Sequence, residues 1–178
     1  MSHNPLDLGA AGSVAKPMQT WSFPPLLKLS STQIGAVGEA VIGAGLMLAS
    51  RGRLSPFKPL ADDHGTDLLL FDKATQKSSP LQIKCRTGFD DVAAQTVQFD
   101  VRLKTYAQEG CGFILAALLD EAAIRACWLF SVSEFSAVAK RKDSKLVIVA
   151  SAKPNAQDKC RPYRHDNLAS VAKKLLGT

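Results

Sequence analysis

Apolar residues along the chain fall into short runs separated by polar, glycine-rich or proline-rich segments. The first run, over residues 31–50, spaces its apolar side chains three and four positions apart, which predicts a helix. Ser31 or Thr32 can cap this helix, and Gly52 follows its end. The run contains Glu39 and four glycines and is shorter than the roughly 20 apolar residues that span a bilayer. We therefore expect a buried helix rather than a membrane span.

The next segments predict strands. Residues 53–60 are β-like but contain two prolines, which cannot donate to a β-ladder, so this segment is expected at a sheet edge. Residues 67–72 and 80–86 flank a turn-rich segment and predict a hairpin. Residues 97–104 alternate apolar and polar side chains, which is typical of a half-buried strand. A second hairpin is predicted over 113–119 and 127–132, and a last strand over 145–150.

Two further helices complete the expected fold. Ser133 can cap a short helix over 134–141, and Asp166 a terminal helix that ends before Gly177. The order helix, strands, helix, strand, helix predicts an α/β fold with a single mixed β-sheet sandwiched by helices. We expect residues 1–30 to form a mobile N-terminal arm and residues 31–178 to form the domain.

Composition narrows the class of protein. The chain has 178 residues, of which 46% are hydrophobic and 21% charged, so it can bury the core of one globular domain and is not disordered throughout. The four cysteines form no close pair, which excludes a zinc ribbon or a small disulfide framework and fits a reducing compartment. Residues 1–20 lack the basic and apolar pattern of a signal peptide. These features favour a cytoplasmic protein.

The charge is unevenly distributed. The net charge is +6, yet residues 140–178 hold ten basic and three acidic side chains, so residues 1–139 sum to −1. A one-sided basic segment favours a polyanionic partner, either nucleic acid or an anionic membrane. A solvated charged surface is the alternative.

Four residues could carry chemistry. Glu39 is the only charged residue between Lys28 and Arg51, and an unpaired buried carboxylate costs several kcal/mol, so it must reach a cation, a metal or a polar cavity. Asp67 opens an apolar strand directly after a loop, where it either serves a site or completes an Asx turn. In the next strand Gln82 and Lys84 share one face, since side chains alternate along a strand.

These residues carry a resemblance. Gly38-Glu39 on the first helix, Gly65-Thr66-Asp67 at a strand start and Gln82-Ile83-Lys84 fifteen residues after Asp67 resemble the core of the PD-(D/E)XK, or restriction-endonuclease-like, nuclease superfamily. The motifs cover roughly residues 31–86. Trp128 to Phe135 resembles the strand-to-helix segment that follows this core in homing-endonuclease-like and uncharacterised prokaryotic members. Gln82 stands where the superfamily usually has a second acid, a variant that occurs among nucleases of this kind.

The resemblance implies a metal-dependent endonuclease that hydrolyses phosphodiester bonds in DNA. Its cofactor would be Mg²⁺ (or Mn²⁺), held by Asp67, Gln82, the carbonyl of Ile83 and Glu39. Lys84 would stabilise the attacking water or the transition state. Because Gln82 removes one negative charge, the alternative is a catalytically inactive nucleic-acid-binding or assembly protein that retains the fold.

The basic segment then has a partner in DNA rather than in a membrane. Lysine and arginine contacts to phosphates supply most non-specific affinity for nucleic acid. Nucleases that cut both strands often act as two-fold dimers, so a homodimer is one expected state. The candidate phosphate contacts are Lys140, Arg141, Lys142, Lys159, Arg161 and Arg164.

Overall fold

The computed structural model describes residues 29–61, 65–87, 96–106, 112–120 and 123–177, so nearly all of the predicted N-terminal arm lies outside the described residues. Two short 3₁₀ segments, η2 (Leu103–Thr105) and η3 (Arg161–Tyr163), join longer elements. In chain order the helices and strands are α1 (Ser31–Ala49), β1 (Leu54–Phe57), β2 (Leu68–Asp72), β3 (Lys77–Thr87), β4 (Thr96–Arg102), β5 (Phe113–Asp120), β6 (Ala123–Ser131), α2 (Val132–Val138), β7 (Lys140–Lys142), β8 (Lys145–Ser151), β9 (Arg164–His165) and α3 (Leu168–Leu176).

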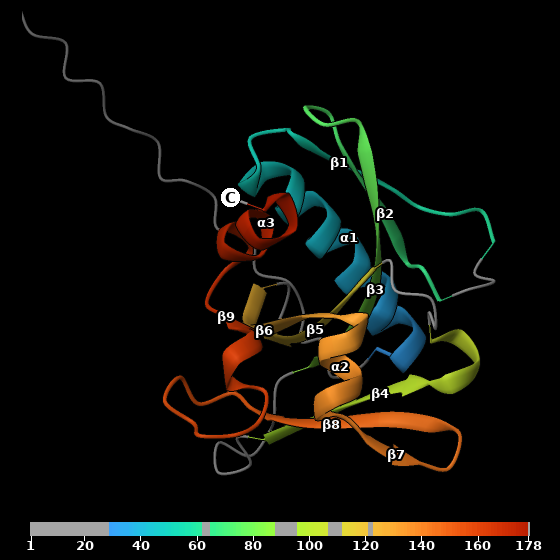
Figure 1. Cartoon of the computed structure of the whole chain (residues 1–178), viewed down its shortest axis with the longest axis vertical. Coiled ribbons are helices and arrows are strands. Elements are labelled where there is room, and N and C mark those ends of the chain that lie inside the picture. The colour runs from blue at the N-terminus through green and yellow to red at the C-terminus, as the bar shows by residue number, and fades with distance from the viewer. Residues whose placement is uncertain (1–28, 62–64, 88–95, 107–111, 121–122, 178) are drawn as a thin grey trace, which may run out of the picture.

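Six strands form a mixed sheet in the order β1-β2-β3-β5-β6-β9 (Figure 1). Strands β3 and β5 pair in parallel, whereas the other neighbours pair antiparallel. The predicted α/β class and mixed sheet are therefore confirmed, as are the edge position of β1 and the hairpin of β2 and β3.

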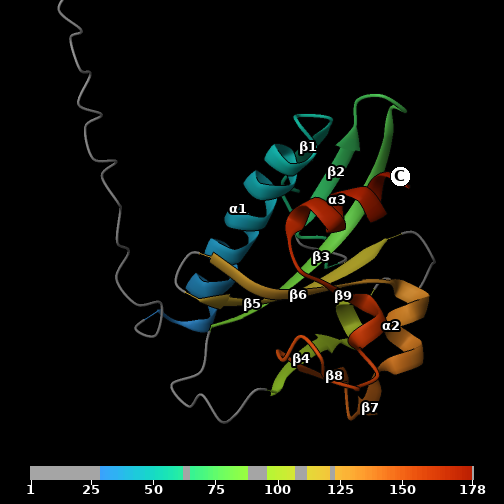
Figure 2. The ribbon, with the colours of Figure 1, turned by 90° about the vertical axis from the view of Figure 1, so that its left-hand side faces the viewer.

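Only part of the strand content lies in this sheet. Strands β4, β8 and β7 form a second, three-stranded sheet, so the expectation of a single sheet is corrected. Helices α1 and α3 cover one face of the large sheet, and the second sheet with α2 covers the other (Figure 2). Strands β5 and β6 are buried on both faces, which explains why their sequences are continuously apolar rather than alternating.

Helix boundaries differ from the sequence expectations by a few residues. Ser30 caps α1 through a capping box with Gln33, and Ser131 caps α2 through a capping box with Glu134. Residues 140 and 141, expected at the end of this helix, instead belong to strand β7, because the chain is already extended at Ala139 and pairs with β8.

Helix α1 lies close to β3. A Cβ on Gly38 would overlap the Cys85 thiol, so only glycine allows this approach. Burial, and then the nearby Glu39 and Asp67, raise the pKa of Cys85 to about 12, which makes the thiol unreactive near neutral pH. By length and composition α1 could also span a membrane, a criterion that a core helix meets equally well; here Ile42 and Leu46 on one side are buried in the core.

Asp72 ties β1 to the β2–β3 hairpin. Its carboxylate accepts hydrogen bonds from Arg53 Nε and Nη2, both at 2.8 Å, and from Thr75 Oγ1 at 2.8 Å and the Ala74 amide at 3.0 Å. The Arg53 hydrogen bonds, which outweigh the opposing effect of burial, hold the pKa of Asp72 well below its usual range.

A lowered pKa contributes its full stabilisation above the pKa of the unfolded carboxylate, about 4, and this contribution is lost progressively as the pH falls toward the lower pKa of the folded state. We therefore expect Asp72→Asn to lower the melting temperature by several degrees at pH 7, and this difference to shrink as the pH falls from about 4 to about 2. Thermal unfolding followed by circular dichroism measures both effects. Asp120→Asn, at an exposed strand end, is the matched control, and a constant difference between wild type and Asp72→Asn across the pH range would contradict the assignment.

Candidate active site

Strands β2 and β3 part at Asp67. The β2–β3 ladder begins with Leu68 opposite Leu81, whereas β3 continues to Thr87. The Asp67 amide donates to the Leu81 carbonyl at 3.0 Å, and Asp67 Oδ2 accepts from the Ile83 amide at 2.5 Å. The Asp67 carboxylate thus accepts the hydrogen bond of the Ile83 amide, which has no partner on β2 beyond the end of the ladder. This bond holds the carboxylate where the two strands separate.

Strand β3 presents two different faces at this point. Leu81 and Ile83 enter the core under α1, whereas Gln82 and Lys84 lie on the opposite face, as the alternation predicted. Gln82 is only 7% exposed, and its side chain lines the cleft between β3 and β4. Because it lines the cleft, the Gln82 side chain offers an amide group to a ligand.

Glu39 reaches this region from α1. Its Oε2 lies 2.7 Å from Lys58 Nζ, just beyond β1, and its side chain is 20% exposed. Glu39 was expected to meet a cation, a metal or a polar cavity. In the structure it pairs with the Lys58 cation and also lines a polar cleft.

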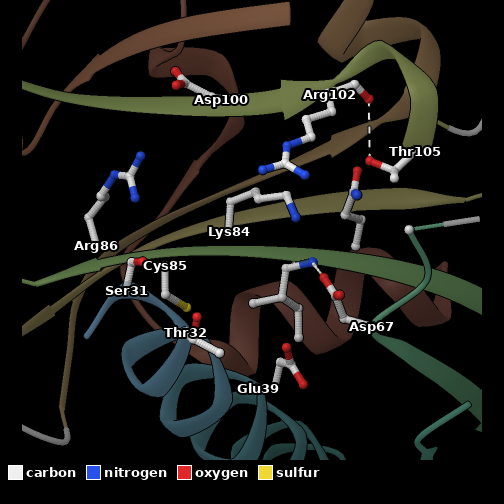
Figure 3. Close-up of a pocket in the computed structure, with 14 residues that line it drawn as sticks. Ser31, Thr32, Glu39, Asp67, Lys84, Cys85, Arg86, Asp100, Arg102 and Thr105 are labelled. Atoms are coloured by element: carbon white, nitrogen blue, oxygen red, sulfur yellow. Dashed lines mark hydrogen bonds between the residues drawn. The ribbon is translucent and has the colours of Figure 1, made fainter. Parts of the chain in front are cut away.

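The predicted residues come together in one cleft of about 460 Å³ between α1, β3 and β4 (Figure 3). Asp67 reaches the backbone of β3, Glu39 rises from α1, and Lys84 points toward β4 (Figure 3). The cleft is lined by Ser31, Thr32, Gly35, Glu39, Gly65, Asp67, Gln82, Ile83, Lys84, Cys85, Arg86, Asp100, Arg102 and Thr105.

Three charged residues of the lining were not singled out from the sequence: Arg86, Asp100 and Arg102. Arg86 continues the polar face of β3, and Arg102 and Asp100 occupy the polar phase of β4, so strand alternation was the available signal. Strand alternation did not indicate that β4 lies next to β3. The two strands are joined there by a hydrogen bond from Arg86 Nε to the Gln98 carbonyl at 3.3 Å.

The cleft carries charges of both signs. Burial raises the pKa of Asp100, but hydrogen bonds from Gln98 Nε2 at 2.8 Å and Lys145 Nζ at 3.4 Å outweigh it, so the net pKa is lowered and the carboxylate is ionised. Within the described part of the chain, neither Lys84 nor Arg102 forms an ion pair. Both cations are therefore available to an anionic ligand.

The oxygen donors of the cleft are limited in number. Asp67, Glu39 and Asp100 supply carboxylates and Gln82 an amide oxygen, and the described residues contain no group of three or more His, Cys, Asp or Glu side chains that could hold a metal. Glutamine at position 82 leaves this set without a carboxylate at the position where the superfamily usually has a second acid.

The predicted phosphate contacts do not line the cleft. Lys140, Arg141 and Lys142 are exposed on β7. Lys159 and Arg161 are exposed near the far end of β8, whereas the Arg164 side chain is only 13% exposed and pairs with Asp166 at 3.1 Å. The six residues thus do not form one surface.

Gly65 closes the cleft beside Gln82. Its φ of +65° lies in the left-handed region, and an added Cβ would overlap the Thr105 carbonyl oxygen and the Gln82 amide. We expect Gly65→Ala to cost more than the about 1–2 kcal/mol of the left-handed backbone alone, because the neighbours must also move. Thermal unfolding measures this cost.

Gly52→Ala is the matched control, since Gly52 has a φ of +78° but open space around its Cβ position. Equal losses of stability in the two variants would mean that contact with Gln82 and Thr105 is unimportant.

Comparisons with known proteins place the fold. No family model and no curated protein matches the chain. Among solved structures, the bacterial homing endonuclease I-Ssp6803I aligns with a TM-score of 0.54 and 18% identity, over 83% of this chain and 93% of that one. The Holliday junction resolvase Hjc of the archaeal hyperthermophile Archaeoglobus fulgidus aligns with a TM-score of 0.40 and 14% identity, over 71% and 96%. The likeness to the homing endonuclease confirms the predicted nuclease-like fold.

Proposed function

We propose that the chain is a divalent-metal-dependent endonuclease that hydrolyses phosphodiester bonds in DNA. One observation carries the proposal: Glu39, Asp67 and the segment Gln82 to Lys84, from different elements, line the same cleft where β2 and β3 part. The shared fold with a homing endonuclease supports the same reaction class.

The donor set fits Mg²⁺ or Mn²⁺ by its chemistry. Asp67, Gln82 and the Ile83 carbonyl offer oxygens, the ligand type that these hard cations prefer. The Gln82 side chain, which is largely buried and lines the cleft beside Ile83, supports this fit. A bound divalent ion would supply a water of lowered pKa and neutralise charge on the phosphate.

Glu39 and Lys58 adjust the charge of the site. Lys58 holds Glu39 at the edge of the cleft through the 2.7 Å ion pair. If a divalent cation replaced the Lys58 ammonium beside Glu39, the Glu39 carboxylate would still have a cationic partner. Glu39 could therefore become a metal ligand without passing through a state in which its buried charge is unpaired.

Lys84 has the position of an electrostatic catalyst. It shares a face of β3 with Gln82 and forms no ion pair among the described residues, so its ammonium can donate hydrogen bonds to the attacked phosphate. Arg86 and Arg102 line the cleft together with Lys84, and their guanidinium groups can bind neighbouring phosphate oxygens.

A cleavage assay tests the function. Supercoiled plasmid and branched DNA are incubated with the protein and Mg²⁺, Mn²⁺ or EDTA. We expect nicked or linear products with either metal and none with EDTA. Absence of metal-dependent product on both substrates would overturn the proposal.

A specific observation favours a second candidate, a nucleic-acid-binding or assembly protein without catalysis. Of the three carboxylates that line the cleft, Glu39 is already paired with Lys58 and Asp100 with Lys145. In that case, salt-sensitive DNA binding would persist without cleavage, and Gln82→Glu would not strengthen metal binding measured by calorimetry.

Two further expectations belong to this proposal. The three cysteines of the described ranges, Cys85, Cys127 and Cys160, are free thiols, which supports a reducing, cytoplasmic location. A two-fold homodimer, which would place a second cleft on the opposite DNA strand, stays a prediction.

A further inference from the structure

The outer face of the β4–β8–β7 sheet carries an ordered set of cations. The inner face of this sheet is apolar and packs in the core through Val97, Phe99, Val101, Ile148 and Ala150. The alternate residues therefore point outward. Arg102 lies opposite Lys145, and Lys145 lies opposite Lys142, so these three side chains form one row across the three strands.

A second row lies beside the first. Asp100 is opposite Val147, and Val147 is opposite Lys140. The outer face thus holds four cations, which are all exposed, against the single strand carboxylate of Asp100 and that of Asp143 in the β7–β8 turn. We call this set, Arg102, Lys140, Lys142 and Lys145, the basic face.

Like charges placed directly opposite each other in a sheet are destabilising. Arg102, Lys145 and Lys142 are consecutive neighbours across the strands, and among the described residues only Lys145 of these three has a carboxylate partner, Asp100 at 3.4 Å. Such a row adds no stability to the isolated domain, whereas a polyanion lying along it would relieve the repulsion.

The basic face is continuous with the cleft. Arg102 both lines the cleft and begins the row, and the Arg86 contact to the Gln98 carbonyl joins β3 to β4. Because neighbouring strands are about 4.8 Å apart, the row extends about 10 Å from Arg102 to Lys142. In Figure 1, β7 lies beyond β8 on the side of the second sheet away from the large sheet.

We propose that the basic face binds the phosphodiester backbone of the nucleic acid that flanks the bond held in the cleft. This inference rests on the proposed function and identifies the surface that holds its substrate. It replaces Lys159, Arg161 and Arg164 as the principal phosphate contacts. Asp158, beside Lys159, accepts from the Ser151 amide at the opposite end of β8, about 20 Å along the strand from Lys145.

A nucleic acid fits this face better than a membrane does. Helices or faces that bind lipid bilayers present large apolar side chains that enter the bilayer beside their cations. Among the large apolar residues that are exposed in the described chain, only Val149 belongs to this sheet. The face therefore offers charge without an apolar anchor.

The test measures binding apart from cleavage. Fluorescence anisotropy with a labelled DNA duplex is recorded in EDTA at several salt concentrations for wild type and for the variant K140Q/K142Q/K145Q. The control K73Q/K77Q/K173Q removes the same charge from exposed positions of the β2–β3 hairpin and of α3. Between about 50 mM and 200 mM salt, the wild type should lose about 40-fold more affinity than the basic-face variant, because three phosphate contacts contribute a slope of about 2.7.

The control triple should keep the salt slope of the wild type. K140Q/K142Q, which retains the Lys145–Asp100 ion pair, should show an intermediate slope. Equal effects of the basic-face and control triples, absence of duplex binding by the wild type, or binding to phosphatidylserine vesicles in preference to duplex would each overturn the inference.

The two proposals fail differently. Duplex binding through the basic face without any metal-dependent product would leave this surface assigned and refute the nuclease activity. Metal-dependent cleavage with an unchanged salt slope in K140Q/K142Q/K145Q would support the nuclease and refute the surface.

Discussion

Asp67→Asn should reduce the rate of metal-dependent cleavage by about three orders of magnitude while leaving the fold intact, since loss of a metal ligand removes several kcal/mol of transition-state stabilisation. The amide oxygen of asparagine can still accept the Ile83 amide hydrogen bond that the carboxylate accepts now. Cleavage rates at saturating Mn²⁺, together with thermal unfolding, measure the two effects separately.

Asp67→Ala is the matched control for this separation. It removes both the charge and the acceptor of the Ile83 amide, so we expect the same loss of activity and an additional loss of about 1–3 kcal/mol of stability. Full cleavage by Asp67→Asn would exclude Asp67 as a metal ligand. A large loss of stability in Asp67→Asn would show that its charge serves the fold.

Lys84→Met should lower the cleavage rate by about 10²–10³-fold with little change in metal affinity, since a cation aimed at developing negative charge acts in the transition state. Methionine preserves much of the length and apolar stem of the side chain. Mn²⁺ binding by calorimetry and single-turnover cleavage measure the two quantities.

Lys77→Met provides the comparison, because Lys77 opens the same strand but is exposed and outside the cleft. Its activity should equal that of the wild type. Equal rates for Lys84→Met and Lys77→Met would remove Lys84 from the mechanism, and cleavage that survived both Asp67→Asn and Lys84→Met would refute the whole assignment.

The local elements of the site could be predicted from the sequence. Helical spacing predicted α1, and strand alternation put Gln82 and Lys84 on one face of β3, opposite the buried Ile83. The hairpin prediction brought Asp67 close to both. These inferences succeeded because they depend on periodicity and on chain neighbours, which are local properties.

The second sheet could not be predicted in the same way. The pattern of β4 indicates a strand with one buried face, but it does not say which strand is its partner. Pairing of β4 with β8 joins residues about fifty positions apart, and β4 also lies next to β3, where Arg102 and Asp100 line the cleft.

The charge pattern of residues 140–178 likewise does not reveal which side chains are neighbours in the folded chain. A count of charges over residues 140–178 treats all of its cations alike. In the folded chain, Arg164 is largely buried beside Asp166, Lys174 lies near Glu134, and Lys142 and Lys145 stand opposite each other on an exposed face. Net charge along the chain therefore does not indicate where a polyanion can bind.

By itself, the sequence determined the α/β class, the face of β3 that carries Gln82 and Lys84, and the order of the candidate residues, because each follows from the backbone period and from hairpin connection. Only the tertiary structure decided that Lys58 pairs with Glu39, that Arg86 and Arg102 join the cleft, and that the basic face continues from it. Those contacts link segments far apart in the chain. They depend on strand order and on packing between layers, which no local pattern encodes.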